Sequence, residues 1–198
     1  MGKYNFDQLI VREGTSCAKY DGLDHYFGVE DAQPLWVADM DFATPKFVQK
    51  ALKKKLKQQI YGYEIASQNL FDTIIFWQKR FGIDLHKEQI LFTSGVVPSL
   101  SVAIKALSQI GDEVIVQPPV YFPFFSVIKH NKRKIIENPL REKNGTYHID
   151  FENLEKIITP KTKLLLLCSP HNPVGRVWSK GELIQLKNIC QRHNIIVI

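Results

Sequence analysis

Residues 169–178, with the sequence SPHNPVGRVW, place a side-chain amide in a stiff turn. Pro170 and Pro173 each fix a backbone φ angle and lack an N–H donor, and Gly175 can adopt conformations that other residues avoid. The Asn172 amide is therefore presented by a rigid loop, from which it can donate a hydrogen bond to a fixed acceptor. The same residues also suit an ordinary turn between a strand and a helix, so both interpretations stay open.

Residues 93–99 (TSGVVPS) suggest a site for an anion. An expected strand gives way here, through Gly95, to a helix whose first turn contains a proline. The first N–H groups of a helix are unpaired and lie at its positive end, so the backbone of Gly95, Val96 and Val97 can bind a phosphate without a lysine. Any turn before a helix has such amides. No GxGxxG or GxxxxGK[ST] pattern is present, which disfavours a dinucleotide or P-loop site.

Two aromatic segments could contribute to the same ligand. Tyr121 follows the apolar segment EVIVQPP, where a flat ring can stack on an aromatic cofactor or simply belong to the core. Tyr61 and Tyr63 flank Gly62, and a phenol there can donate to a phosphate across a subunit boundary or pack locally.

The elements that must position these residues alternate regularly from residue 89 onward. Short apolar segments are followed by stretches with helical periodicity, which predicts an α/β fold with a largely parallel sheet and helices on both faces. The expected strands are residues 89–95, 113–119, 133–138, 164–168 and the segment that opens at Ile195. The expected helices are residues 97–110, 121–131, 151–158 and 180–193.

The N-terminal part lacks this alternation. Residues 1–33 are expected to form an irregular arm, and residues 34–45 (PLWVADMDFATP) an extended segment. One helix is expected from Pro45, with Thr44 as its N-cap, to about Gln59, with lysines on its exposed face. A second is expected at residues 67–80. The apolar segment 195–198 ends the sequence inside an expected buried strand, so we expect the chain to be the N-terminal part of a longer protein.

Composition narrows the classes of protein. With 198 residues, 44% of them hydrophobic and 23% charged, the chain can bury a core. Its net charge of +6 comes largely from short lysine and arginine runs without interleaved aromatic residues, so we expect no nucleic-acid partner. The three cysteines have no metal-ligand spacing, and no metal site is expected. No segment has the length of a membrane span, and we expect a cytoplasmic protein.

The order of motifs resembles a known family. The segments WVADMDF, YGYE, TSGVVPSL, PPVYFPF and SPHNPVGRVW occur in the order typical of the aminotransferase class I/II superfamily, a group of fold-type I pyridoxal 5'-phosphate (PLP) enzymes. WVADMDF resembles specifically its cystathionine β-lyase branch, the MalY/PatB-type C–S lyases. The resemblance implies the PLP-dependent transferase fold, with residues 1–45 as arm and substrate-side segment. Residues 46–198 would then be the N-terminal part of the large PLP-binding domain.

The resemblance also implies roles for single residues. Gly95, Val96 and Val97 would hold the PLP phosphate, Tyr121 would stack on the pyridine ring, and Asn172 would donate to the phenolic oxygen. Tyr63 would reach the cofactor phosphate of the neighbouring subunit of a homodimer. The substrate side would be lined by four consecutive residues: Trp36, Val37, Ala38 and Asp39.

No catalytic residue is assigned within the chain, because the Schiff-base lysine is expected beyond Ile198. The implied activity of the intact protein is β-elimination from cystathionine or a cysteine conjugate, an amino-acid substrate, to a thiol, pyruvate and ammonia. The 198 residues alone are expected to be inactive. A PLP-dependent aminotransferase and a non-catalytic truncated product or binding protein are the alternatives.

Overall fold

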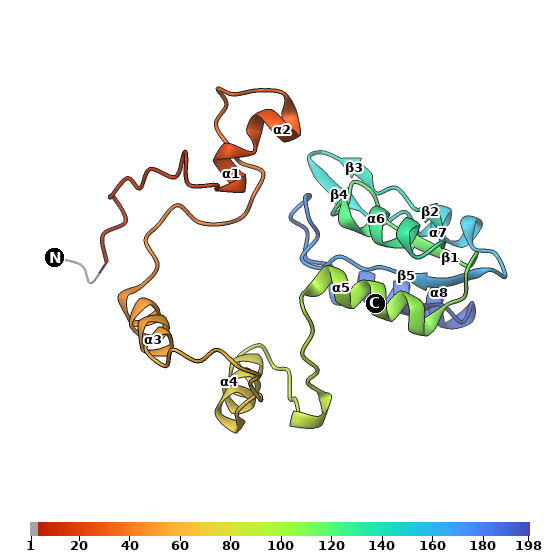
Figure 1. Cartoon of the computed structure of the whole chain (residues 1–198). Coiled ribbons are helices and arrows are strands. Elements are labelled where there is room, and N and C mark those ends of the chain that lie inside the picture. The colour runs from red at the N-terminus through yellow and green to blue at the C-terminus, as the bar shows by residue number, and fades with distance from the viewer. Residues whose placement is uncertain (1–3) are drawn as a thin grey trace. The chain divides into compact units, whose positions relative to one another are not determined.

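The computed structural model describes residues 4–198 and divides into two compact units, Met1–Gln68 and Asn69–Ile198. The second unit contains an α/β sandwich (Figure 1). The boundary predicted at residue 45 divides the arm and substrate-side segment from the large domain. It does not coincide with the division into compact units at residue 68, and it stays a prediction.

The second unit is built on a four-stranded sheet in which every neighbouring pair is parallel. The strand order is β2 (Lys134–Glu137), β1 (Glu113–Val116), β5 (Thr162–Leu165) and β6 (Ile196–Val197). The predicted α/β class and parallel sheet are therefore confirmed. Strand β5 begins two residues before the predicted start, because Thr162 pairs with Glu113 on β1.

Alternating side chains of β1 and β5 divide the core between the two faces of the sheet. Val114 and Leu164 lie in one cluster with α5 (Val96–Leu107) and α6 (Pro123–His130). Ile115 and Leu165 lie in a second cluster with α7 (Phe151–Ile157) and α8 (Lys180–Arg192). These four side chains have no exposed surface, and truncating such a leucine to alanine typically costs about 2–5 kcal/mol. The prediction of helices on both faces is confirmed.

The structure differs from the sequence-based prediction at two places in this unit. Residues 89–95 do not form the predicted strand: the short helix η1 (Lys87–Gln89) is followed by segment 90–95 with no ladder to the described residues, and Leu91 and Phe92 are exposed. An extended segment becomes a strand only beside a hydrogen-bonded partner. Conversely, β3 (Arg141–Lys143) and β4 (Thr146–His148) form an antiparallel hairpin that was not predicted.

The first unit has little regular structure. It contains α1 (Ala18–Asp21), α2 (Leu23–Phe27) and α3 (Lys46–Leu56), and α4 (Gln68–Lys79) begins at its boundary. The two helices expected in this region are observed as α3 and α4, whereas the arm that was expected to be irregular contains the short helices α1 and α2.

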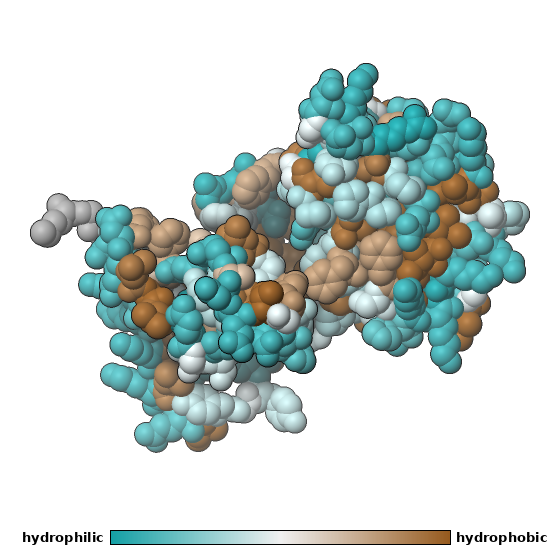
Figure 2. Space-filling model, turned by 90° about the horizontal axis from the view of Figure 1, so that it is seen from above, coloured by the Kyte–Doolittle hydropathy of each residue, from teal (hydrophilic) through white to brown (hydrophobic). Residues whose placement is uncertain are grey.

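Hydrophobic side chains reach the surface in both units. Figure 2 shows them as brown areas among hydrophilic ones. In the first unit several large apolar side chains are mostly exposed, among them Leu9, Leu35, Met40, Ile60 and Ile65. Apolar surface of this kind is what a protein–protein contact covers.

Candidate active site

The loops that follow β1 and β5 leave the same edge of the sheet, because the two strands are parallel neighbours. In α/β sheets the carboxyl ends of the strands are where ligands bind. The first loop carries Tyr121 and the second carries Asn172, so both predicted residues lie at this edge.

Asn172 lies in a loop held by its own main chain. The His171 N–H donates to the Arg176 carbonyl at 2.7 Å, and the Gly175 N–H donates to the His171 carbonyl at 2.7 Å. Gly175 has a φ of 71°, the left-handed conformation for which a glycine was expected. The main-chain N–H of Asn172 donates to Cys168 Sγ at 3.2 Å, whereas its exposed side-chain amide makes no hydrogen bond within residues 4–198. The amide is therefore available to a ligand.

Tyr121 is half-buried. Its ring packs against the cluster on the α5 and α6 face and meets the Phe124 ring edge-on, with 6.0 Å between the centroids. One side of the ring therefore belongs to the core, and stacking of its remaining surface on a cofactor stays a prediction.

His171 joins the two loops. Its Nε2 lies 3.0 Å from the Pro119 carbonyl oxygen, and its ring meets the Trp178 ring edge-on at 5.4 Å between centroids. The Trp178 Nε1–H donates in turn to the Cys168 carbonyl at 2.9 Å. The side chain is only 1% exposed, and burial lowers the pKa of the imidazole below its ordinary value. Sequence analysis assigned His171 no role, because nothing in the turn pattern shows that it is buried.

The start of α5 offers an anion site at the same edge. At its other end α5 is tied to the start of β2, since Arg133 donates to the Ser108 carbonyl at 2.6 Å. The start of β2 lies at the amino edge of the parallel sheet. Because the helix has 12 residues and is about 18 Å long, its first turn lies toward the carboxyl edge. Leu100, from that part of the helix, packs against the same cluster as Tyr121.

Donors are free at this helix start. Gly95 is the N-cap residue, with a φ of 148° and no side-chain cap, and the N–H groups of Val96 and Val97 make no hydrogen bond to the described part of the chain. The hydroxyl groups of Thr93 and Ser99, which are 2.6 Å apart, lie beside them. Unpaired amides and the helix dipole together favour a phosphate or carboxylate.

The predicted substrate-side residues belong to the first unit and are held by the arm. Trp36 Nε1 donates to the Lys19 carbonyl at 3.1 Å, and the Trp36 ring contacts the rings of Tyr26 and Phe27. Val37 is half-buried, and Ala38 is exposed.

Asp39 and Asp41 form an ion-pair network with the arm. Arg12 pairs with both carboxylates, and Lys19 Nζ lies 2.6 Å from Asp41 Oδ2. Hydrogen bonds from Lys19 and then Arg12 lower the pKa of Asp41 to about 2. The hydrogen bond that Arg12 donates to Asp39 is the largest cause of the raised pKa of Arg12. The acids therefore neutralise arm cations, an arrangement that sequence analysis missed because the partners lie more than 20 residues apart.

Tyr63 is fully exposed, whereas the Tyr61 hydroxyl donates to the Leu56 carbonyl at 2.7 Å. Tyr63 belongs to the first compact unit and the other predicted cofactor-binding residues belong to the second.

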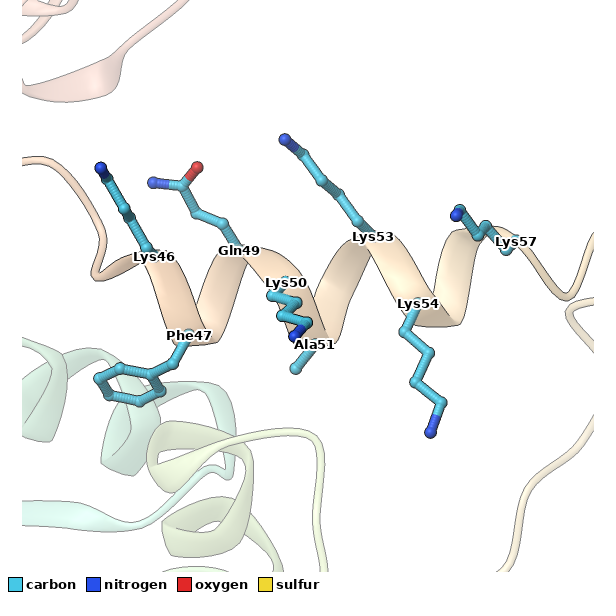
Figure 3. Close-up of a pocket in the computed structure, with 8 residues that line it drawn as sticks. All are labelled: Lys46, Phe47, Gln49, Lys50, Ala51, Lys53, Lys54 and Lys57. Atoms are coloured by element: carbon cyan, nitrogen blue, oxygen red, sulfur yellow. The ribbon is translucent and has the colours of Figure 1, made fainter.

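A hollow of about 910 Å³ runs along α3 (Figure 3). Lysines and the Phe47 ring line it, and no predicted ligand-binding residue does. Over residues 4–198, no three His, Cys, Asp or Glu side chains gather as a metal site. None of the helices described is both long and apolar enough to cross a membrane.

Comparison with known proteins identifies related chains. The family model for aminotransferase class I and II matches residues 35–198. Cystathionine beta-lyase PatB of Bacillus subtilis is 46% identical over 196 residues, which cover 98% of this chain and 51% of that protein. Protein MalY of Escherichia coli is 31% identical over 98% of this chain and 51% of its own length. The crystal structure of cystalysin from Treponema denticola, which contains a PLP cofactor, matches with a TM-score of 0.89 at 39% identity, over 98% of this chain and 50% of that one. The chain thus spans about half the length of these relatives.

Proposed function

The chain belongs to the aminotransferase class I and II family, and from this membership we propose that the intact protein is a PLP-dependent C–S β-lyase. Its substrate would be cystathionine or a related cysteine conjugate, and with water the products would be a thiol, pyruvate and ammonia. The observation that carries this proposal is the 46% identity, over 98% of the chain, to a protein named cystathionine beta-lyase.

The residues at the sheet edge suit PLP, an aromatic ring with a phosphate and a phenolic oxygen. The free N–H groups of Val96 and Val97, at the positive end of α5, suit the phosphate. The Tyr121 ring offers a flat apolar surface, and the Asn172 amide is a donor without a partner in the described chain. Gly95, as an open N-cap, lets the phosphate approach the backbone.

When bound, PLP supplies an electron sink for the carbon that loses its proton beside the scissile C–S bond. The chain's own residues bind and orient. The α5 amides anchor one end of the ligand, Tyr121 fixes the plane of the ring, and Asn172 stabilises negative charge on the phenolic oxygen. The orientation of the ring plane matters because the C–H bond that loses its proton must stand perpendicular to that plane.

The substrate side is proposed to be the segment Trp36, Val37, Ala38 and Asp39. Its support is the arm that holds it: Trp36 is fixed by the Lys19 carbonyl, and Asp39 is paired with Arg12. Asp39 would then position the segment through Arg12, with the neighbouring residues facing substrate. Residues 1–45 would serve as arm and substrate-side segment, and residues 46–198 as part of the large domain.

The intact protein is proposed to be a cytoplasmic homodimer whose sites are shared between subunits. The exposed apolar side chains of the first unit and the fully exposed Tyr63 support a partner surface. The described cysteines are all free, as in a reducing compartment.

The test is the reaction itself. Full-length protein, purified with PLP, is incubated with cystathionine, and pyruvate and free thiol are measured together. Equal amounts of both support the lyase. An enzyme that transfers the amino group to a keto acid without releasing pyruvate is an aminotransferase, the second candidate, which the family's name favours.

A further inference from the structure

His171 is a buried polar side chain for which the proposed chemistry has no use. It occupies the contact between two loops that are separated by about 50 residues in sequence, and its Nε2 faces the Pro119 carbonyl at 3.0 Å. A carbonyl oxygen only accepts hydrogen bonds, so Nε2 must carry the proton. This bond links the loop of Tyr121 directly to the loop of Asn172.

The other ring nitrogen fixes the charge of the imidazole. With the proton on Nε2, the neutral ring has a lone pair on Nδ1, and this buried atom has no hydrogen-bond partner among the described residues. A second proton would create a charged donor in a place that is 1% exposed. Burial is accordingly the largest cause of the lowered pKa of His171.

The charges around His171 offer it no counter-ion. The ionisable side chains on the two loops that His171 joins are Tyr121, Cys168 and Arg176. Arg176 forms an ion pair with Glu182, so that carboxylate is already neutralised. Around the ring itself lie the carbonyl groups of residues 119, 168 and 117.

The rest of the His171 environment is rigid. Trp178 is 3% exposed, packs with Leu140 and Ile149, and holds the Cys168 carbonyl through its indole N–H. His171 is thus fixed on its own loop by Trp178, and the bond from Nε2 connects that loop to Pro119.

We propose that His171 is a positioning residue that staples the Tyr121 loop to the Asn172 loop, so that the stacking ring and the amide donor keep one spacing for the same ligand. The proposal rests on the proposed PLP site and adds to it the residue that holds its two halves together. His171 touches no ligand in this scheme: it acts through Pro119 and through its own main chain.

The first test needs no cofactor. Protonated imidazole quenches tryptophan fluorescence on contact, and Trp178 is in contact with His171. In the protein without PLP, we expect a quenching step whose midpoint lies below the ordinary histidine value of about 6.5. The step should disappear in His171→Gln and in Trp178→Phe. A midpoint at or above that value would overturn the neutral staple.

The second test separates the hydrogen bond from the ring. His171→Gln keeps an N–H donor that can reach the Pro119 carbonyl, and His171→Phe keeps the ring against Trp178 but has no donor. We expect faster amide hydrogen exchange at residues 117–122 and 168–176 in the Phe variant, with β1 and β5 unchanged. PLP should bind about tenfold more weakly to the Phe variant, the effect of one hydrogen bond, and the Gln variant should lie closer to wild type.

The outcomes distinguish the two proposals. Wild-type exchange and wild-type PLP affinity in both variants would refute the staple. If wild-type protein binds no PLP but loop exchange still rises in His171→Phe, the cofactor proposal fails and the staple stands. If the Phe variant does not fold, the Trp178 titration decides, since it uses folded protein.

Discussion

At Asn172, the main chain is hydrogen-bonded within the loop and the side chain is not. The N–H is bound by Cys168 Sγ and the flanking loop is closed by two short main-chain hydrogen bonds, while the amide remains exposed. The turn chemistry of Pro170, Pro173 and Gly175 made this arrangement predictable from sequence. The burial of the adjacent His171 was not predictable, because it depends on Trp178 and on a carbonyl from another strand.

Asn172→Ala should weaken PLP binding by about 1.5–3 kcal/mol, the value of a hydrogen bond to a charged group. The measurement is the dissociation constant of PLP, with Gln191→Ala, an exposed amide on α8, as the control. Equal affinities in both variants would reduce Asn172 to a turn residue.

Asp41→Asn should destabilise the arm in a pH-dependent way. The folded pKa of Asp41 is about 2, below its ordinary value of 3.8, so its stabilising effect is present above pH 4 and is lost as the pH falls through 2. In urea titrations followed by Trp36 fluorescence, the difference between wild type and variant should therefore shrink between pH 4 and pH 2. A difference that stays constant over that range would mean that Asp41 is not ion-paired.

Among the strands, those of the parallel sheet were predicted, whereas the two of the β3–β4 hairpin were not. Apolar segments such as EVIV became strands because both faces of the sheet are covered. Strand β3 is charged and exposed and β4 is only partly buried, so periodicity gave no signal. Asn144-Gly145, both with positive φ, is a two-residue hairpin turn that could have revealed the hairpin. Residues 89–95 have strand-like composition, but composition cannot supply a pairing partner.

Helix α8 begins where the Asn172 loop ends, and its first turn is held by a capping box between Ser179 and Glu182. Ser179 Oγ accepts from the Glu182 N–H, and Glu182 accepts from the Ser179 N–H at 2.7 Å while also pairing with Arg176. Such a cap satisfies two of the helix's free donors and fixes where the loop ends.

Ser179→Ala should lower the free energy of unfolding by about 1 kcal/mol. Ser179→Asp should keep most of this stabilisation, because aspartate is also a good N-cap residue. Denaturant titration measures both, and Lys180→Ala, at the next exposed position, is the control. A loss of equal size in the Asp variant would exclude capping as the cause.

Across the whole molecule, the two compact units differ in how they bury their side chains. The second unit has two clusters around a sheet, whereas α3 and the arm leave large apolar side chains exposed. The family resemblance was carried by five motifs spread over both units, and only the fold of the second could be derived from periodicity.

A mixed dimer should reveal shared sites. Subunits with Tyr63→Phe are combined with subunits that lack the cofactor-binding lysine expected outside these 198 residues. If Tyr63 serves the neighbouring site, one site of each hybrid carries both defects and the other carries neither, so activity returns on mixing. Hybrids with no more activity than the separate variants would indicate that each site is built by one subunit.

The 198 residues alone should release no pyruvate from cystathionine above the rate of free PLP. Lys105 and Lys129 are exposed on α5 and α6, and Lys105 lies nine residues beyond Val96, about 14 Å along the helix. Turnover that disappears in Lys105→Ala or Lys129→Ala would show that one of these lysines reaches the cofactor.

The strand order also sets the sequence in which the site can assemble during synthesis. Glu113 on β1 pairs with Lys134 across a short crossover, but with Thr162 only after the hairpin and α7 have been made. The entropy of closing a loop grows with its length, so β1 and β2 can associate while β5 is still being translated. Until β5 joins them, the Tyr121 loop lacks its neighbour, the loop that carries Asn172. The proposed ligand site is therefore completed late, when β5 arrives with the loop that carries His171 and Asn172.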